Sequence, residues 1–245
     1  MKKITVKRLA FDAIFAAITA VLYCYVKFKL PIFPSFLDVN ISMIAVIIAA
    51  FMLGPWDAGI LVLIRFLMKV LLVGTSTQYV GELADILIGI VPAIGAGVIY
   101  HYTNWKHKTL FAFIFTIASW VLMGIISNLF INIPFYSSFY FKKNYYTDGV
   151  PAALVGMCGS AFELITFGLI KAETVTADNF MVYYIFLAVI PFNLMLSLFV
   201  TLITAPIHQR LKVLYEMIPN NFRKTESKDD SSNKDDEVKD NIYND

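Results

Sequence analysis

Residues 74–89, GTSTQYVGELADILIG, place hydroxyl and carboxylate groups between long apolar runs. Hydrocarbon cannot solvate such groups, so at membrane depth or at its rim they must find partners. Polar and ionisable residues in that position typically mark the path of a substrate or an ion. A ligand site is therefore expected first at this segment.

The sequence on either side of this segment has the composition of a membrane protein. Hydrophobic residues make up 58% of the 245 residues, and the mean hydropathy is +0.69. Apolar runs long enough to cross a bilayer recur. We predict an all-α, polytopic membrane protein with six transmembrane helices. Residues 1–215 are expected to form this domain, and the polar residues 216–245 a disordered, charged cytoplasmic tail.

Two of the predicted helices are short for a segment that needs ~20 residues to cross a bilayer. They are joined by residues 54–57, GPWD, which indicate that one helix stops and the next starts. An aromatic loop is predicted from residue 134, and the apolar residues 151–170 form either a lid or a further span. The lid is favoured, because a seventh span would put the two termini on opposite sides. The six predicted spans cover residues 9–26, 41–53, 57–73, 81–100, 110–133 and 181–211.

Lys and Arg residues near the segment ends predict the orientation. They cluster at the amino terminus, at 106–108 and at 210–212. With six spans, all three clusters fall on one side, the cytoplasm. The predicted protein is thus a multi-pass protein of the cell membrane with both termini in the cytoplasm, and the loops at 27–37, 74–80 and 134–179 face outward.

Four charged residues are expected at one membrane level. Arg65 and Lys69 share one helix face, and Glu82 and Asp85 share a face at the start of the next helix. Two cations and two carboxylates at that level should pair, because an unpaired charge there is costly. We predict that Arg65, Lys69 and Asp85 form a structural ion-pair network.

The mouth of the loop at 74–80 is a predicted contact for substrate. Glu82 lies beside Thr75, Thr77 and Gly81 in the sequence, where it is placed to accept hydrogen bonds from a polyhydroxylated ligand. Asp38, directly after the outward loop at 27–37, is a further candidate for substrate binding.

Asn128 and Asn193 are amides in predicted apolar helices. A carboxamide offers acceptor and donor groups, so it can match a ligand edge that presents both C=O and N–H. Pro191 frees a backbone carbonyl and opens the sixth helix locally. The alternative is a hydrogen bond between helices, worth ~0.6 kcal/mol on average in membrane proteins. The residue types alone do not decide between these roles.

Small residues line one helix of the predicted bundle. Ala13 and Ala17 are four residues apart, as are Ala16 and Ala20, so each pair shares a helix face. Small residues at this spacing let a second helix approach closely in lipid. The partner helix is either part of another protein or part of this chain.

The sequence predicts no metal site, cofactor or catalytic residue. His101, His107 and His208 lie at predicted cytoplasmic ends without a cysteine or carboxylate at ligand spacing. Cys24 and Cys158 lie in apolar surroundings and are expected to act as small hydrophobic residues. The chain has no phosphate-binding loop, so any ATP that drives it must bind another chain.

Several long motifs together resemble the S components of energy-coupling factor (ECF) vitamin transporters, and more narrowly their riboflavin-specific branch. The resemblance covers residues 9 to 212 and leaves out only the tail. The motifs that carry it are LDVNISMIAVIIAAFMLGPWDAG (37–59), LIRFLMKVL (63–71), GTSTQYVGELADILIG (74–89), SNLFINIPFY (127–136) and VIPFNL (189–194).

This resemblance implies a six-helix subunit that captures a vitamin from outside. The subunit then docks on a transmembrane T subunit, which two cytoplasmic ATPases drive. The implied partners are riboflavin or a related small molecule, the T subunit, the two ATPases and the lipid bilayer, with no nucleic acid. Riboflavin is a transported substrate here and no cofactor. In the family, the alanine-rich face of the first helix contacts the T subunit, which assigns Ala13 and Ala17, with Ala16 and Ala20 as further members.

The riboflavin branch also suggests a role for the two amides. Its asparagines at the ends of the fifth and sixth helices meet the isoalloxazine ring, which points to Asn128 and Asn193. The pyrimidine edge of that ring alternates C=O and N–H, the pattern that a carboxamide complements. Relatives that bind riboflavin often carry a lysine three residues after the second asparagine, where this chain has Leu196. This departure leaves open a weaker flavin site or a different ligand.

Three alternatives accompany this interpretation. The first is an S component for another vitamin or precursor with a planar ring. A self-sufficient secondary transporter would show internal repeats and discontinuous helices in corresponding halves, and the sequence shows no such duplication. A membrane enzyme would need a metal or nucleophile constellation, which the sequence does not contain.

Overall fold

The computed structural model describes residues 6–75 and 79–211. The predicted tail at 216–245 and the candidate Thr77 lie outside these residues. The described part is helical apart from one short β-hairpin and the connecting loops. Its elements in chain order are α1 (Val6–Tyr25), β1 (Lys27–Lys29), β2 (Asp38–Asn40), α2 (Met43–Met52), α3 (Pro55–Leu72), α4 (Val80–Tyr102), α5 (Lys108–Ser127), the π-helix η1 (Asn128–Asn132), α6 (Ile133–Phe141), α7 (Tyr145–Asp148), α8 (Ala152–Ile165), the 3-10 helix η2 (Ala172–Thr174), α9 (Phe180–Tyr183), the π-helix η3 (Tyr184–Val189) and α10 (Ile190–Arg210).

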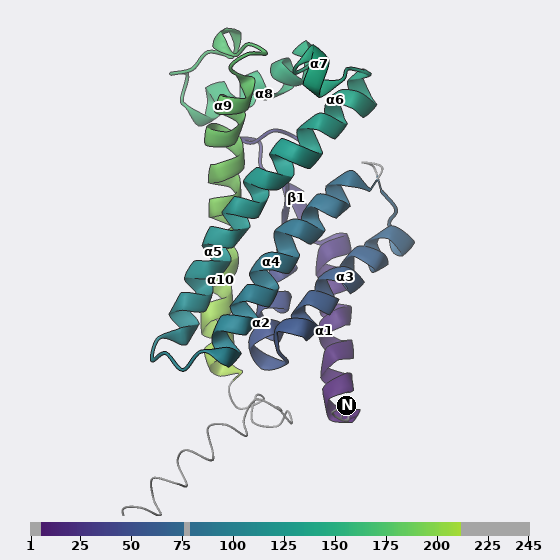
Figure 1. The fold of residues 1–245 in the computed structure, drawn as a ribbon, viewed down its shortest axis with the longest axis vertical. Coiled ribbons are helices and arrows are strands. Elements are labelled where there is room, and N and C mark those ends of the chain that lie inside the picture. The colour runs from purple at the N-terminus through teal and green to yellow at the C-terminus, as the bar shows by residue number, and fades with distance from the viewer. Residues whose placement is uncertain (1–5, 76–78, 212–245) are drawn as a thin grey trace, which may run out of the picture.

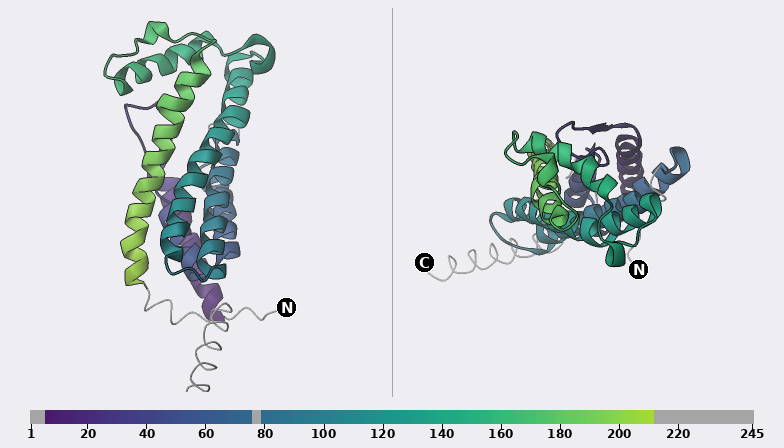
Figure 2. Two further views of the ribbon diagram at one scale, coloured as in Figure 1. Left: turned by 60° about the vertical axis from the view of Figure 1, so that its left-hand side comes forward. Right: turned by 90° about the horizontal axis from the view of Figure 1, so that it is seen from above.

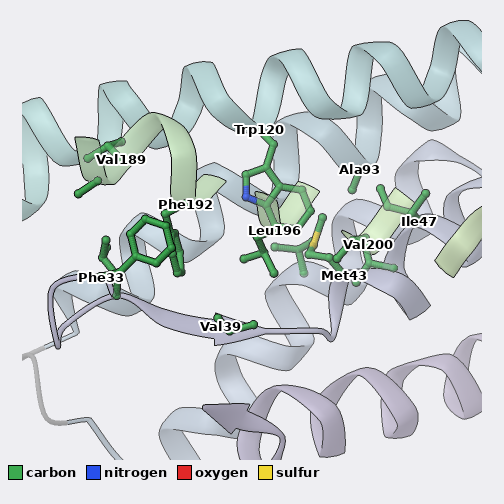
Figure 3. Close-up of a cluster of buried hydrophobic side chains, with 14 of the residues drawn as sticks. Phe33, Val39, Met43, Ile47, Ala93, Trp120, Val189, Phe192, Leu196 and Val200 are labelled. Atoms are coloured by element: carbon green, nitrogen blue, oxygen red, sulfur yellow. The ribbon is translucent and has the colours of Figure 1, made fainter. Parts of the chain in front are cut away.

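The long helices run side by side as a bundle (Figure 1). Helix α1 begins and α10 ends at the same end of this bundle, while α6 to α9 gather at the opposite end (Figures 1 and 2). The short helix α2 lies inside, and nine of its ten residues are buried. Apolar side chains from α2, α4, α5 and α10 form the core beside it, as Figure 3 shows for Ile47, Ala93, Trp120 and Val200.

The predicted stop and restart at residues 54–57 is present between α2 and α3. Gly54 has a φ of 127°, which a residue with a Cβ adopts only under strain, and Pro55 starts α3. Gly97 of α4 lies against this turn, and a Cβ there would come within 2.7 Å of the Cα of Pro55. The turn therefore holds α3 and α4 in close contact.

Four helical segments of the described part are long and apolar enough to cross a membrane: Arg8–Tyr25, Val80–Tyr102, Lys108–Phe141 and Phe180–Arg210. Helix α3 has 18 residues but carries Asp57, Arg65 and Lys69. Helix α2 has 10 residues, a length of about 15 Å. The count of six spans thus depends on α2 and α3 and stays a prediction.

The predicted end of the fifth span at residue 133 is wrong. The helix continues through α6 to Phe141, so the aromatic residues 134–141 are helical and do not form a loop. The π-helix η1 directly precedes Pro134, so the hydrogen-bond pattern of the helix is already widened where the proline lacks an N–H. The sixth predicted span has the same arrangement, with η3 followed by Pro191 at the start of α10.

The apolar residues 151–170 contain one helix, α8, of 14 residues. Its length of about 21 Å is short of the ~30 Å hydrocarbon core. The helix lies across the end of the bundle (Figures 1 and 2). This geometry agrees with the lid and not with a further span.

Candidate substrate-binding site

A cavity of about 340 Å³ opens inside the bundle between the β-hairpin, α3, α4, α5, η1 and α10. This volume falls within the ~300–1,000 Å³ that is typical of small-molecule sites. All the predicted substrate contacts that the structure describes line it: Asp38, Thr75, Gly81, Glu82, Asn128 and Asn193. Residues far apart in the sequence thus line one cavity, as residues that bind the same substrate must.

Glu82 is held in place at one wall of the cavity. Its Oε1 lies 2.6 Å from Nζ of Lys69, and its Oε2 accepts a hydrogen bond of 2.9 Å from the hydroxyl of Thr75. The side chain of Glu82 is 2% exposed and that of Lys69 is 11% exposed. A buried pair of this kind has to be kept intact, because loss of either partner leaves an uncompensated charge.

The predicted network of Arg65, Lys69 and Asp85 is corrected by this geometry. Lys69 pairs with Glu82 and makes no salt bridge with Asp85. Asp85 instead accepts a hydrogen bond of 2.7 Å from the hydroxyl of Tyr23 in α1. The helix faces of the four residues were predictable from their spacing, but the rotation of α4 against α3 decides which carboxylate meets Lys69.

Arg65 links four elements at the base of this wall. Its guanidinium donates to the hydroxyl of Ser42 at 2.7 Å and to the backbone oxygen of Asp85 at 3.3 Å. It also lies over the ring of Tyr23, at 4.8 Å from the ring centroid, which is a cation–π geometry. The centroid of the same ring lies 5.2 Å from Nζ of Lys69, so both cations lie against the ring of Tyr23.

Another part of the cavity lining, on η1, carries a chain of amides. Nδ2 of Asn128 donates to the backbone oxygen of Gly124 at 2.8 Å, and its Oδ1 accepts a hydrogen bond of 2.6 Å from the hydroxyl of Tyr184. Nδ2 of Asn132 donates to the same Oδ1 at 3.2 Å. Asn128 therefore makes the predicted hydrogen bond between helices and also lines the cavity. Its contact with a ligand stays a prediction.

Asn193 reaches the same wall from α10. Its Nδ2 donates to the backbone oxygen of Val189 at 2.8 Å. Val189 ends the π-helix η3, as Asn128 begins η1. Asn128 therefore lies in a π-helical segment and Asn193 is hydrogen-bonded to the last residue of another. This type of irregularity is frequent at functional sites.

Apolar and aromatic side chains complete the cavity. Phe36, Trp120, Tyr136 and Phe192 line it, and the ring of Phe36 packs edge-on to that of Tyr136 at 5.6 Å. Leu196 lies beneath the indole of Trp120 and beside Phe192 (Figure 3). At position 196, this chain therefore presents an apolar surface to the cavity.

Several of these residues were missed from the sequence. Tyr23, Ser42, Trp120 and Tyr136 each belong to apolar stretches whose inward face is unknown before the helices are packed. Asn132 could have been predicted from the sequence, because it lies four residues after Asn128 and so shares its helix face.

The family model for the substrate-specific component of ECF transporters matches residues 7–208. The chain belongs to this family. Among solved structures, "Structure and mechanism of the S component of a bacterial ECF transporter" superposes with a TM-score of 0.57 at 22% identity, over 85% of this chain and 96% of that one. This likeness shows a shared fold. No curated protein matches the chain.

As an S component, the chain is a membrane-embedded transport subunit that binds a small molecule and is not an enzyme. Among the residues that the structure describes, no group of three or more His, Cys, Asp or Glu could hold a metal ion.

The alanine face of this S component divides into two parts. Ala13 and Ala17 are exposed on α1, whereas Ala16 packs against the core and Ala20 is 5% exposed. Ala20 therefore packs within the chain's own bundle and is not available at its surface. Ala20 was predicted as a further interface residue, and this prediction is wrong. The four-residue spacing does not distinguish two adjacent strips of one helix.

Proposed function

We propose that this S component captures riboflavin from outside the cell and delivers it through a T subunit and two ATPases. The chain would cross the membrane six times, with α2 and α3 as the second and third spans. Both termini would lie in the cytoplasm, and the end formed by α6 to α9 would face outward.

The cavity is lined by two different kinds of side chain, and this observation is the main support for the proposal. Asn128, Asn132 and Asn193 lie with Trp120 and Phe192 on η1, α5 and α10. These groups suit a flat ring with C=O and N–H groups on one edge. Hydroxyl and charged groups from α3, α4 and the loop between them make up the other surface, which suits a ribityl chain. Riboflavin has these two parts.

The charges of the cavity favour a neutral ligand. Three cations and three carboxylates line the described part of the cavity: Lys27, Arg65, Lys69, Asp38, Glu82 and Asp85. An anionic vitamin would face three carboxylates without a surplus of positive charge. Riboflavin is uncharged, so it adds no charge that the protein would have to compensate.

Leu196 limits how the ring is held. Its apolar packing under Trp120 supplies no charged donor (Figure 3). The ring edge would then depend on the amides alone. The same wall would also accept another vitamin or precursor with a planar, amide-like ring.

The direct test is a titration of riboflavin fluorescence with the detergent-solubilised chain. We expect quenching with a dissociation constant well below micromolar. Unquenched fluorescence at micromolar protein would exclude riboflavin as the ligand. The same assay with other planar vitamins would then identify the alternative ligand.

The amides are tested in the same assay. Asn128→Ala and Asn193→Ala should each weaken binding by about 1–3 kcal/mol, because each leaves ligand groups unpaired in a desolvated cavity. Asn104→Ala is the matched control, since Asn104 is exposed between α4 and α5 at the other end of the bundle. Parental affinity in both cavity variants would make these amides purely structural.

A further inference from the structure

Trp120 of α5 carries a hydrogen-bond donor that the described part of the chain does not use. Its side chain lines the cavity, and the residue is 3% exposed. The indole N–H donates to no described group, yet its nitrogen is not fully enclosed. It differs in this from Oδ1 of Asn132, which also lacks a partner but has no accessible surface. A buried tryptophan usually places its N–H against an acceptor, so an accessible, unpaired N–H in a cavity points to an acceptor on the ligand.

The packing of the indole leaves its N–H edge for a ligand. Leu196 lies beneath the indole, and the indole nitrogen is on the edge that is turned toward Phe192 (Figure 3). Both neighbours belong to α10 and line the cavity. Their side chains are hydrocarbon, so they offer the N–H no oxygen or nitrogen acceptor. Because Leu196 covers one face of the indole, a ligand would meet Trp120 through the N–H edge.

The amide of Asn193 supplies an acceptor near this donor. Its Nδ2 donates to the backbone oxygen of Val189 at 2.8 Å, so Oδ1 is the end that is left for a ligand. Gly124 lies against this amide and follows Trp120 by one turn of α5. Neighbouring parts of the cavity thus offer an N–H and a C=O. Such a pair complements a ring edge on which a carbonyl adjoins an N–H.

We propose that Trp120 is a substrate-binding residue whose Nε1–H donates a hydrogen bond to a carbonyl oxygen of the substrate ring. The inference rests on the proposed flavin function and adds to it, because an indole then holds the ring edge together with the amides. The donor is neutral, so it suits an uncharged ligand in a cavity whose cations and carboxylates are equal in number. Trp120 lies outside every motif that carries the family resemblance.

The test removes the N–H and keeps the shape of the side chain. Benzothienylalanine, in which sulfur replaces the indole N–H, is incorporated at position 120. It should weaken riboflavin binding by roughly tenfold, because a ring carbonyl is left without its donor in a desolvated cavity. Lumiflavin has the same ring without the ribityl chain and should lose affinity by the same factor. Fluorescence titration measures both losses, and thermal unfolding without ligand should stay parental.

The same replacement at Trp105 is the control. Trp105 is 56% exposed, packs against Phe111 and does not line the cavity. With benzothienylalanine at this position, the affinity for both flavins should stay parental.

A measurement on the natural side chain decides the matter if the replaced chain does not fold. Ultraviolet resonance Raman scattering reports the hydrogen bonding of an indole N–H. When Trp56 and Trp105 are replaced by Phe, Trp120 is the one tryptophan left in the sequence. Its N–H band should shift toward the hydrogen-bonded form when riboflavin or lumiflavin is added.

Three results would overturn the assignment. The first is parental riboflavin affinity with benzothienylalanine at position 120. The second is a loss for riboflavin but not for lumiflavin, which would place the N–H against the ribityl chain. The third is a Raman band that does not change when a flavin binds. Failure of the proposed function looks different: the parent chain itself then binds neither flavin, and the assignment of Trp120 falls with it.

Discussion

Gly124 of α5 lies directly against the side-chain amide of Asn193 in α10. A Cβ atom on Gly124 would come within 2.6 Å of Nδ2 of Asn193. The same glycine accepts a hydrogen bond from Asn128 through its backbone oxygen. One glycine thus positions both amides of the cavity, one through its backbone and the other through its missing side chain.

Gly124→Ala should displace the amide of Asn193 and weaken flavin binding, by about 1–3 kcal/mol if the hydrogen bond of that amide to the ligand is lost. Flavin titration measures the effect, and thermal unfolding in detergent checks the fold. Gly156→Ala is the control, because Gly156 lies in α8 with nothing within 4 Å of its Cβ position. Equal affinity in the two variants would show that Asn193 does not contact the ligand.

The pair of Lys69 and Glu82 should contribute to stability as well as to the site. Glu82→Gln leaves Lys69 without its counter-charge in a buried position, and a loss of about 3–5 kcal/mol in unfolding free energy is expected. Unfolding in detergent, without ligand, measures this loss. Glu173→Gln changes an exposed carboxylate and should have little effect.

Exchanging the two charges tests whether the stability comes from the attraction between Lys69 and Glu82 or from other contacts of each side chain. Lys69→Glu combined with Glu82→Lys should recover part of the stability that either single variant loses. If the double variant is as unstable as the sum of the single ones, the two side chains stabilise the fold through other contacts.

The exposed strip of α1 should act in transport and not in binding. Replacing Ala13 or Ala17 with Trp should block close approach of a partner helix. Flavin affinity of the isolated chain should stay parental, whereas uptake in cells that also express the T subunit and the ATPases should collapse. Ile114→Trp introduces the same bulk at an exposed position on α5 and should transport normally.

Two outcomes would count against this interface. Normal uptake with Ala13→Trp and Ala17→Trp would show that no partner helix approaches there. Loss of flavin binding in the isolated chain would mean that the strip packs inside the protein, as Ala20 does.

Cys158 of α8 should report whether the end of the bundle opens. Burial raises the pKa of its thiol to about 12. At pH 8 the thiol therefore stays protonated, and the reactive thiolate is on the order of one part in ten thousand. Maleimide labelling should be slow at pH 8 and should accelerate as the pH is raised toward 9.

The control for this labelling is Ser160→Cys in a Cys24→Ser, Cys158→Ser background. Ser160 is exposed in the same helix, so its thiol should react at an ordinary rate. Equally fast labelling of Cys158 in the parent would show that α8 leaves the bundle easily.

The sequence alone determined the class of protein and nominated some of the residues that line the cavity. Long apolar runs need a membrane, and polar groups within them need partners, so composition and spacing were enough to predict the membrane helices and to nominate Glu82 as a ligand contact. The ligand role predicted for Asn128 and Asn193 came from the family resemblance, because the residue types alone left it open. These arguments depend on local chemistry, which a sequence displays directly.

The tertiary structure decided which of these groups meet. The axial rotation of α4 brought Glu82, and not Asp85, to Lys69. The packing of α1 buried Ala20 but exposed Ala17, although both belong to the small-residue pattern. The π-helix η1 let the fifth helix continue past Pro134 and placed Asn132 beside Asn128. Helix rotation, burial and partner choice depend on contacts between distant segments, and the spacing of residues along one helix does not contain them.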